Sequence, residues 1–209
     1  MIELRPDETA LIVIDPQNGA YHEDGTLAQS GVDITEPRAT IPRIQRLVEL
    51  CRAAGIPDVW TKQLHYAEDR ARMAHRIQHH TLKRKRVAFQ AGTWDSEFVD
   101  ELKPLVTPET HVIEKHKWSA FYGTRLSPLL RILGTRLLLV CGGTTNACVE
   151  STVRDAFMRD FDVMVVRDCV AGVNPKWHEA ALETWAMYIG EVVDLAEVEE
   201  QLTAREKAA

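Results

Sequence analysis

Short apolar runs alternate with amphipathic stretches along most of this chain, and this alternation limits the folds that it can adopt. Six runs are candidate strands, at residues 10–14, 58–61, 111–114, 136–141, 162–167 and, more weakly, 190–193. The runs are apolar at consecutive positions, which is typical of strands that are buried on both faces. They therefore predict a largely parallel sheet covered by other elements on each side.

Helical patterns separate these runs. Apolar residues recur at helical spacing from Ile41 to Cys51 and stop before Gly55, and another helix is expected to begin at Asn174-Pro175. Shorter helices are predicted at residues 127–133 and 149–157, and a charged helix in the tail from 195 to 209. Strands that alternate with helices form right-handed βαβ units, so we expect one α/β doubly wound domain over residues 1–209.

Composition and charge exclude several classes of protein. A chain of 209 residues with 45% hydrophobic residues is long enough for a sizeable core. Its net charge of −6 argues against nucleic acid as a partner, and the basic run at residues 83–86 is interpreted as a solvated loop. No apolar stretch approaches the roughly 20 residues of a membrane helix, and the amino terminus lacks a signal-peptide core. We expect a cytoplasmic protein with no membrane partner.

Three polar residues stand where predicted strands end. Asp15 follows the first strand, Lys115 follows the third, and Cys148 lies just beyond the fourth, in the first turn of the next helix. Ligands of such sheets gather at the carboxyl ends of the strands. A thiol at a helix amino terminus beside a lysine is expected to lose its proton below the usual pKa of about 8.5. An acid, a cation and a thiol together are the general requirement for covalent catalysis.

Each of these residues also has a plainer interpretation. Taken alone, Asp15 could cap the loop after the first strand, and Lys115 could be a surface lysine with Lys117 as its competitor. Cys148 alone could be a small buried apolar residue. The other three thiols are interpreted as packing residues: Cys51, Cys141 and Cys169. Only the combination of the three strand-end residues favours a catalytic site.

Three ordered motifs resemble those of the isochorismatase-like cysteine hydrolases. They are LIVIDPQN at residues 11–18, KHKWSAF at 115–121 and GGTTNACVEST at 142–152, and the resemblance covers nearly the whole chain. It implies a three-layer α/β/α fold with a six-stranded, mainly parallel sheet in the order 3-2-1-4-5-6. Asp15, Lys115 and Cys148 would then converge. Lys115 rather than Lys117 holds the family's place four residues before the serine.

The resemblance implies amide hydrolysis through a thioester. Asp15 would take the thiol proton, Lys115 would hold the charges in place, and Cys148 would attack the carbonyl carbon. A cis peptide bond of the family maps onto Gly143 and Thr144, where it would aim the Thr144 and Cys148 amides at the oxyanion. The Gly-Gly pair also has a plain interpretation as a flexible turn between strand and helix.

The residues also bear on the substrate class. A cysteine at position 148 favours amidases over isochorismatases proper, which cleave a vinyl ether without needing the thiol. Residues 92–102 are similar to ureidoacrylate amidohydrolases, which favours a small ureido, carbamoyl or primary amide substrate. A nicotinamidase-type amidase is the alternative. Nicotinamidases bind a metal through an aspartate and histidines that follow the second strand. Because no aspartate follows the second strand here, we expect no metal at His75 and His79. No cofactor is expected either.

The resemblance also implies a pocket and an assembly. Several positions that line the family's pocket differ here, and six residues are expected to line it: Gln17, Tyr21, Gln63, His65, Trp118 and Phe121. A homodimer or homotetramer is expected. A second hypothesis from another class is a non-catalytic small-molecule binder or redox sensor in which Cys148 forms a bond with Cys141.

Overall fold

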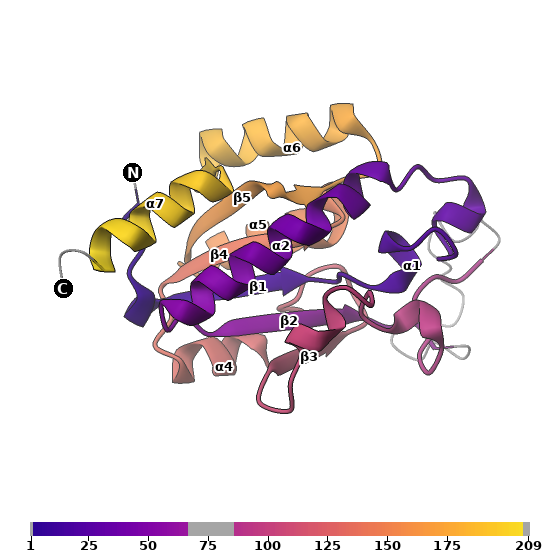
Figure 1. Cartoon of the computed structure of the whole chain (residues 1–209), viewed down its shortest axis with the longest axis horizontal. Helices are drawn as coiled ribbons and strands as arrows, with labels where there is room; N and C mark the ends of the chain where they lie inside the picture. The colour runs from indigo at the N-terminus through magenta and orange to yellow at the C-terminus, as the bar shows by residue number, and fades with distance from the viewer. Residues whose placement is uncertain (1, 67–85, 207–209) are drawn as a thin grey trace.

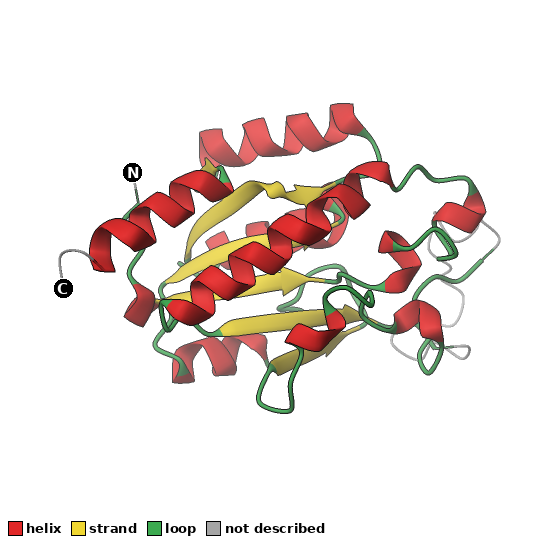
Figure 2. Cartoon of the chain, in the orientation of Figure 1, coloured by secondary structure: helices red, strands yellow, loops and turns green. Residues whose placement is uncertain are grey.

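A parallel sheet lies between two layers of helices in the computed structural model, which describes residues 2–66 and 86–206 (Figures 1 and 2). Its six strands have the order β3-β2-β1-β4-β5-β6, so the predicted doubly wound topology is confirmed. The strands are β1 (Thr9–Ile14), β2 (Asp58–Gln63), β3 (His111–Lys115), β4 (Leu137–Gly143), β5 (Asp162–Ala171) and β6 (Glu191–Val193). All five pairs of neighbouring strands are parallel.

Helices cover both faces of this sheet. The helices are α1 (Asn18–Tyr21), α2 (Thr35–Ala53), α4 (Leu126–Ile132), α5 (Glu150–Phe157), α6 (Pro175–Tyr188) and α7 (Leu195–Glu206). Figure 1 shows α2 and α7 in front of the sheet and α4 and α5 behind it. The buried side chains of α6 belong to the same apolar core as those of α4 and α5. No helix of the described ranges is both long and apolar enough to span a membrane.

The central strands explain why the sequence folds in this way. Every residue of β1 and β4 is buried, as their uninterrupted apolar runs predict. The two strands pair from Thr9 with Leu137 to Ile14 with Gly142. This pairing joins two separate apolar cores, one on each face of the sheet. The ends of β1 and β4 therefore lie side by side, at the point where the strand order changes direction.

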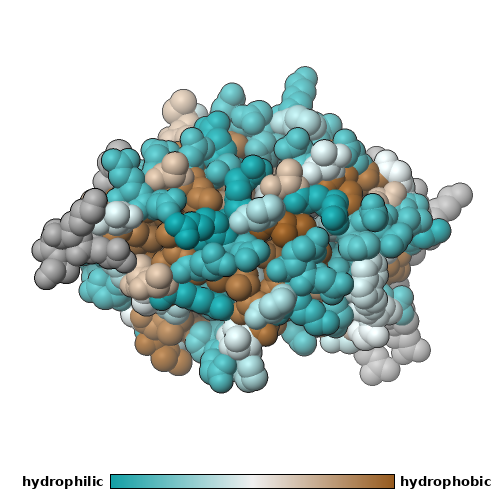
Figure 3. Space-filling view, in the orientation of Figure 1, coloured by the Kyte–Doolittle hydropathy of each residue, from teal (hydrophilic) through white to brown (hydrophobic). Residues whose placement is uncertain are grey.

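Helix α2 shows how one layer is attached. Its buried residues recur at helical spacing and face the sheet: Pro37, Thr40, Ile41, Ile44, Leu47, Val48 and Cys51. The surface on this side of the molecule is mainly hydrophilic, with apolar side chains visible between the polar ones (Figure 3). The amphipathic pattern that predicted the helix is therefore also the pattern that orients it.

Several strands are longer than the apolar runs that predicted them. Strand β2 reaches Gln63 and β3 reaches Lys115, and these two residues are paired in register. Strand β5 continues to Ala171 after an irregularity in its pairing with β4. Cys169 consequently lies inside β5 rather than just past it. An apolar pattern does not extend a strand over the polar residues at its end. These residues nevertheless form part of the polar site described below.

Gly142 in β4 is required by close packing against β1. Its φ is +106°, and a Cβ at this position would lie 2.2 Å from the carbonyl oxygen of Ile14. Because that contact is with backbone, it cannot be relieved by a rotamer change. The glycine therefore sets how closely β1 and β4 approach at the end that carries Asp15.

We expect Gly142→Ala to lower the free energy of unfolding by about 3 kcal/mol or more, since it combines an unfavourable φ with a backbone clash. Gly134→Ala is the matched control, because Gly134 has a φ of +69° but nothing within 4 Å of the added Cβ. It should cost only about 1 to 2 kcal/mol. Urea unfolding of both variants measures the difference. Equal losses in the two variants would contradict the packing argument.

Candidate active site

Asp15 lies directly after β1 and is held by a residue of β2. The Thr61 hydroxyl donates a hydrogen bond of 2.6 Å to Asp15 Oδ1, and the Asp15 N–H donates to Thr61 Oγ1 at 3.2 Å. Asp15 has a φ of 47°, an unusual value for a residue other than glycine, and its side chain is almost fully buried. The Asp15 carboxylate is oriented by Thr61 and Lys115, and not by capping the loop after β1.

Lys115 ends β3 and reaches across β2 to the end of β1. Its Nζ lies 2.7 Å from Asp15 Oδ2 and donates to Gln63 Oε1 at 2.8 Å and to the Lys117 carbonyl at 3.2 Å. It also lies 3.3 Å from Cys148 Sγ. The ammonium is fully buried, with acceptors from three strand ends around it. Lys115, and not Lys117, occupies the centre of the cluster.

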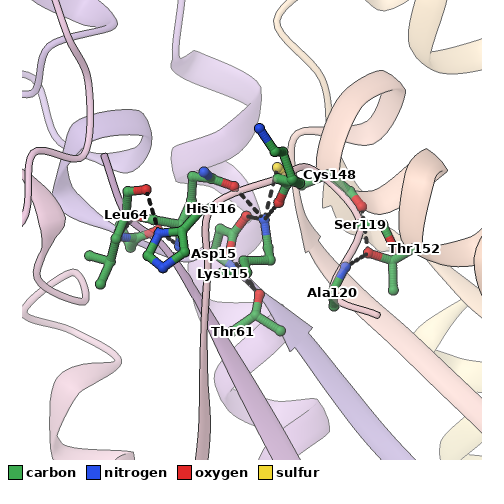
Figure 4. Close-up of polar contacts among 12 residues, drawn as sticks. Asp15, Thr61, Leu64, Lys115, His116, Ser119, Ala120, Cys148 and Thr152 are labelled. Carbon is green, nitrogen blue, oxygen red and sulfur yellow. Dashed lines mark hydrogen bonds and ion pairs between the residues drawn. The ribbon is translucent and has the colours of Figure 1, made fainter. Parts of the chain in front are cut away.

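Cys148 reaches the same cluster from the opposite side. It lies in a π-helical turn, Thr145–Val149, between β4 and α5, and therefore just before the helix rather than in its first turn. The Thr152 hydroxyl donates to the Cys148 carbonyl at 2.7 Å and accepts from the Ala120 N–H at 3.0 Å. Thr152 thus ties the cysteine turn to the loop that follows Lys115. Figure 4 shows the three predicted residues converging.

Burial, more than the neighbouring charges, sets the protonation state of the Cys148 thiol. Burial alone would lower the pKa of Lys115, but Asp15 and Cys148 outweigh it, so this pKa lies above its ordinary value. Burial raises the pKa of Cys148 to about 12, although Lys115 acts in the opposite direction. The prediction of a lowered thiol pKa was wrong, because desolvation is stronger than the attraction of the lysine. The resting thiol is protonated at neutral pH.

The turn after β4 forms the side of the cluster next to Cys148. The peptide bond between Gly143 and Thr144 is cis, which is the isomer that the resemblance implied. A Cβ on Gly143 would lie 2.7 Å from the Tyr21 hydroxyl oxygen. Together with the contact of Gly142 described above, this shows that the two glycines are fixed by packing and are not a flexible turn.

A pocket of about 310 Å³ opens on this cluster. Asp15 and Cys148 line it, together with the cis Gly143–Thr144 unit. Three of the six predicted pocket residues also line it, namely Gln63, His65 and Trp118. The pocket is therefore bounded by the ends of β1, β2 and β4 and by the loops that follow them.

The other three predicted pocket residues are absent from the pocket wall. Gln17 is fully buried and braces the loop after β1, since its side chain bonds the backbone of Gln63 at 2.8 and 3.0 Å and the Ser96 carbonyl at 2.7 Å. Tyr21 lies in the core beneath Gly143. Phe121 lies in the core on the opposite face of the sheet. All three are buried in the fold and do not line the pocket.

Sequence reasoning missed two aromatic residues of the wall. Phe89 and Trp177 both line the pocket, and Trp177 is 56% exposed. Trp177 falls within the helix that is expected to begin at Asn174-Pro175, and nothing in its spacing distinguishes it from Trp185, which is buried in the core. Its position at the start of a helix after a strand end is the one signal that could have identified it.

The structure also bears on the metal and redox alternatives. His75 and His79 lie outside the described residues, as does most of the basic run. Within residues 2–66 and 86–206, no group of three metal-binding side chains is close enough to hold an ion. Cys141 packs into the core on the α2 side, whereas Cys148 packs into the core on the α5 side. This separation across the sheet argues against a bond between the two sulfurs.

Comparisons with known proteins agree with this fold and its motifs. The sequence model of the Isochorismatase domain family matches residues 9–197. A ureidoacrylate amidohydrolase RutB from Acinetobacter baylyi is 33% identical over 205 residues, which cover 92% of this chain and 83% of that protein. The structure of a cysteine hydrolase from Pseudomonas syringae pv. phaseolicola has a TM-score of 0.85 at 23% identity, covering 98% of this chain and 96% of that one.

One further solved structure is relevant to the alternatives. A nicotinamidase/pyrazinamidase from Bacillus subtilis has a TM-score of 0.76 at 28% identity, covering 90% of this chain and 100% of that one. The same fold is therefore present in proteins named for different activities.

We expect Cys148 to be alkylated by iodoacetamide in the native protein at least about tenfold faster than the other three thiols. Cys148 lines the pocket, whereas Cys51, Cys141 and Cys169 have no exposed surface. Peptide mass spectrometry measures each site, and urea-unfolded protein, in which all four thiols should react, is the control. Native alkylation of Cys141 at the rate of Cys148 would contradict the structure.

Proposed function

The chain belongs to the isochorismatase family, and on this premise we propose that it is a cysteine amidohydrolase that needs no metal. In this proposal it hydrolyses a small ureido, carbamoyl or primary amide and releases ammonia. The observation that carries the proposal is that the Lys115 ammonium contacts both Asp15, at 2.7 Å, and Cys148, at 3.3 Å. Asp15 and Cys148 line the same pocket. The relatives named ureidoacrylate amidohydrolase support the substrate class.

The first half of the proposed reaction forms a thioester. Asp15 accepts the proton of the Cys148 thiol as the sulfur attacks the carbonyl carbon of the substrate. The carbonyl π bond opens to an oxyanion, which the Thr144 and Cys148 N–H groups would stabilise. When the carbonyl re-forms, the C–N bond breaks. Asp15 returns its proton to the departing nitrogen, which leaves as ammonia.

The second half consumes water. Asp15 accepts a proton from a water molecule as the water oxygen attacks the thioester carbonyl. The C–S bond then breaks, and the proton on Asp15 passes to the sulfur of Cys148. The net reaction adds one water, releases ammonia and the acid, and returns the carboxylate and the thiol to their starting states.

Lys115 has an electrostatic role in this scheme. Before proton transfer its ammonium faces the Asp15 carboxylate, and afterwards it faces the Cys148 thiolate. The buried cluster therefore contains one positive and one negative charge at both stages. Because the thiol pKa is raised to about 12, a proton acceptor in direct reach is needed, and Asp15 provides it.

The pocket supports a small planar substrate. Its volume of about 310 Å³ suits a compact acyl group, and aromatic rings of Phe89, Trp118 and Trp177 contribute to the wall. Gln63 and His65 add polar groups near the nucleophile. A ureido group is planar and carries both donors and acceptors, so it matches this mixture of aromatic and polar lining.

A nicotinamidase-type amidase activity is the second candidate function. It rests on the likeness to the nicotinamidase/pyrazinamidase structure at 28% identity. A planar aromatic amide would also fit an aromatic wall, so pocket shape alone does not separate the two. The choice depends on the substrate that is turned over and on its response to a chelator.

We expect Cys148-dependent, chelator-resistant release of ammonia from ureidoacrylate or an N-carbamoyl compound. Cys148→Ala should lower kcat by at least about 10³-fold, because it removes the nucleophile. Cys51→Ala is the matched control: it also removes a buried thiol, but one that does not line the pocket. That variant should keep its kcat while losing stability. The assay is ammonia production with each variant, with and without chelator.

Two results would overturn parts of this proposal. Normal turnover by Cys148→Ala would exclude the thioester mechanism. Release of ammonia from nicotinamide alone, abolished by chelator, would favour the nicotinamidase-type candidate instead.

A further inference from the structure

The first turn of α6 lies against the turn that carries Cys148. Helix α6 begins after Asn174, whose side chain caps it by accepting a hydrogen bond from the Trp177 N–H at 3.2 Å. Two consecutive residues of this turn then contact different parts of the site. Trp177 lines the pocket, and His178 contacts Thr145.

The contact between His178 and Thr145 is specific. His178 Nδ1 lies 2.8 Å from Thr145 Oγ1, and Thr145 is fully buried. Thr145 follows Thr144 directly and begins the π-helical turn that contains Cys148. Gly172, between β5 and α6, lies beneath this contact, since a Cβ there would be 3.5 Å from the Cβ atoms of both His178 and Thr145.

We propose that His178 is a positioning residue that fixes, through Thr145, the turn carrying the Thr144 amide and the Cys148 sulfur. This inference rests on the proposed amidohydrolase function, because it concerns the geometry of that reaction. His178 does not line the pocket, so it would act on the turn and not on the substrate.

The charge state of His178 fits this role. Burial lowers the pKa of the imidazole, and Arg167 acts in the same direction, whereas Glu179 and Glu36 oppose them. The ring is therefore neutral at pH 7, and its bond to Thr145 joins two neutral groups. Its Nε2 lies 3.8 Å from Glu179 Oε1, beyond hydrogen-bond distance. Nδ1 is the nitrogen through which the ring holds Thr145.

The position of Thr145 explains why this contact matters for rate. It lies between the two backbone amides that are proposed to stabilise the oxyanion, and such donors must meet the developing charge within a few tenths of an ångström. A displacement of about 1 Å in a reacting group can cost about 10²-fold in rate. Losing the contact should therefore lower kcat more than it raises KM.

Four variants separate positioning from packing. His178→Asn keeps a polar atom close to the place of Nδ1, whereas His178→Gln places its polar atoms closer to that of Nε2. His178→Ala removes the ring, and Thr145→Val removes the hydroxyl while keeping the shape. We expect His178→Ala, His178→Gln and Thr145→Val to lower kcat by about tenfold or more, with KM changed less than threefold. His178→Asn should retain at least a third of the wild-type kcat.

The double variant Thr145→Val/His178→Ala should be no slower than the slower single variant, because both changes break the same contact. Equal losses in His178→Asn and His178→Gln, or additive losses in the double variant, would overturn the proposal. Thermal unfolding is recorded for each variant, since a purely structural role would lower Tm and leave the kcat of folded protein unchanged.

A second measurement does not depend on amidase activity. The rate of Cys148 alkylation by iodoacetamide should rise or fall at least threefold in His178→Ala and Thr145→Val, because the sulfur is no longer held in place. It should stay near the wild-type value in His178→Asn. An unchanged rate in all variants would reject the positioning role. If the wild type released no Cys148-dependent ammonia, the proposed function would fail, while the alkylation rates would still decide whether His178 positions the turn.

Discussion

The buried ion pair between Asp15 and Lys115 is the interaction on which the rest of this site depends. A charge removed from water is costly unless it is paired and hydrogen-bonded. Here the ammonium contacts the carboxylate at 2.7 Å and the Gln63 side chain at 2.8 Å, and Thr61 supports the carboxylate at 2.6 Å. These contacts join the ends of β1, β2 and β3. Removing either charge would leave its partner buried without compensation.

The same burial that makes the ion pair necessary also determines how the thiol is used. A lysine alone can lower the pKa of a solvent-exposed cysteine. Desolvation instead raises the pKa of Cys148 and keeps its thiol protonated. The site therefore requires a base beside the sulfur, and the carboxylate already held by Lys115 fits this requirement. In our account, Asp15 is the proton carrier and Lys115 keeps the charge balance constant during transfer.

The apolar runs predicted the parallel sheet, because strands buried on both faces are continuous apolar runs. The convergence of Asp15, Lys115 and Cys148 was implied by the resemblance of three motifs, which supplied the strand order, and strand ends of such a sheet meet at one edge. The sequence predicted a lowered thiol pKa, which was wrong, since depth of burial depends on the loops that cover the thiol. Gln17, Tyr21 and Phe121 were misplaced for a related reason: the position of a side chain beyond a strand end is set by tertiary contacts. Trp177 and His178 belong to the first turn of α6, which is distant in sequence from the other site residues, and apolar spacing does not distinguish them from residues of an ordinary helix.

The most direct test of this account is a titration of the Cys148 thiolate by its ultraviolet absorbance, taken as the difference between wild type and Cys148→Ser. Burial raises the folded-state pKa to about 12, so the thiol should hold its proton at neutral pH and lose it only in the alkaline range. We predict no thiolate signal from this residue between about pH 5 and pH 9 in the free protein. A titration with a midpoint below the ordinary value of about 8.5 would show a thiolate activated by Lys115 alone and would contradict the role of Asp15 as the base.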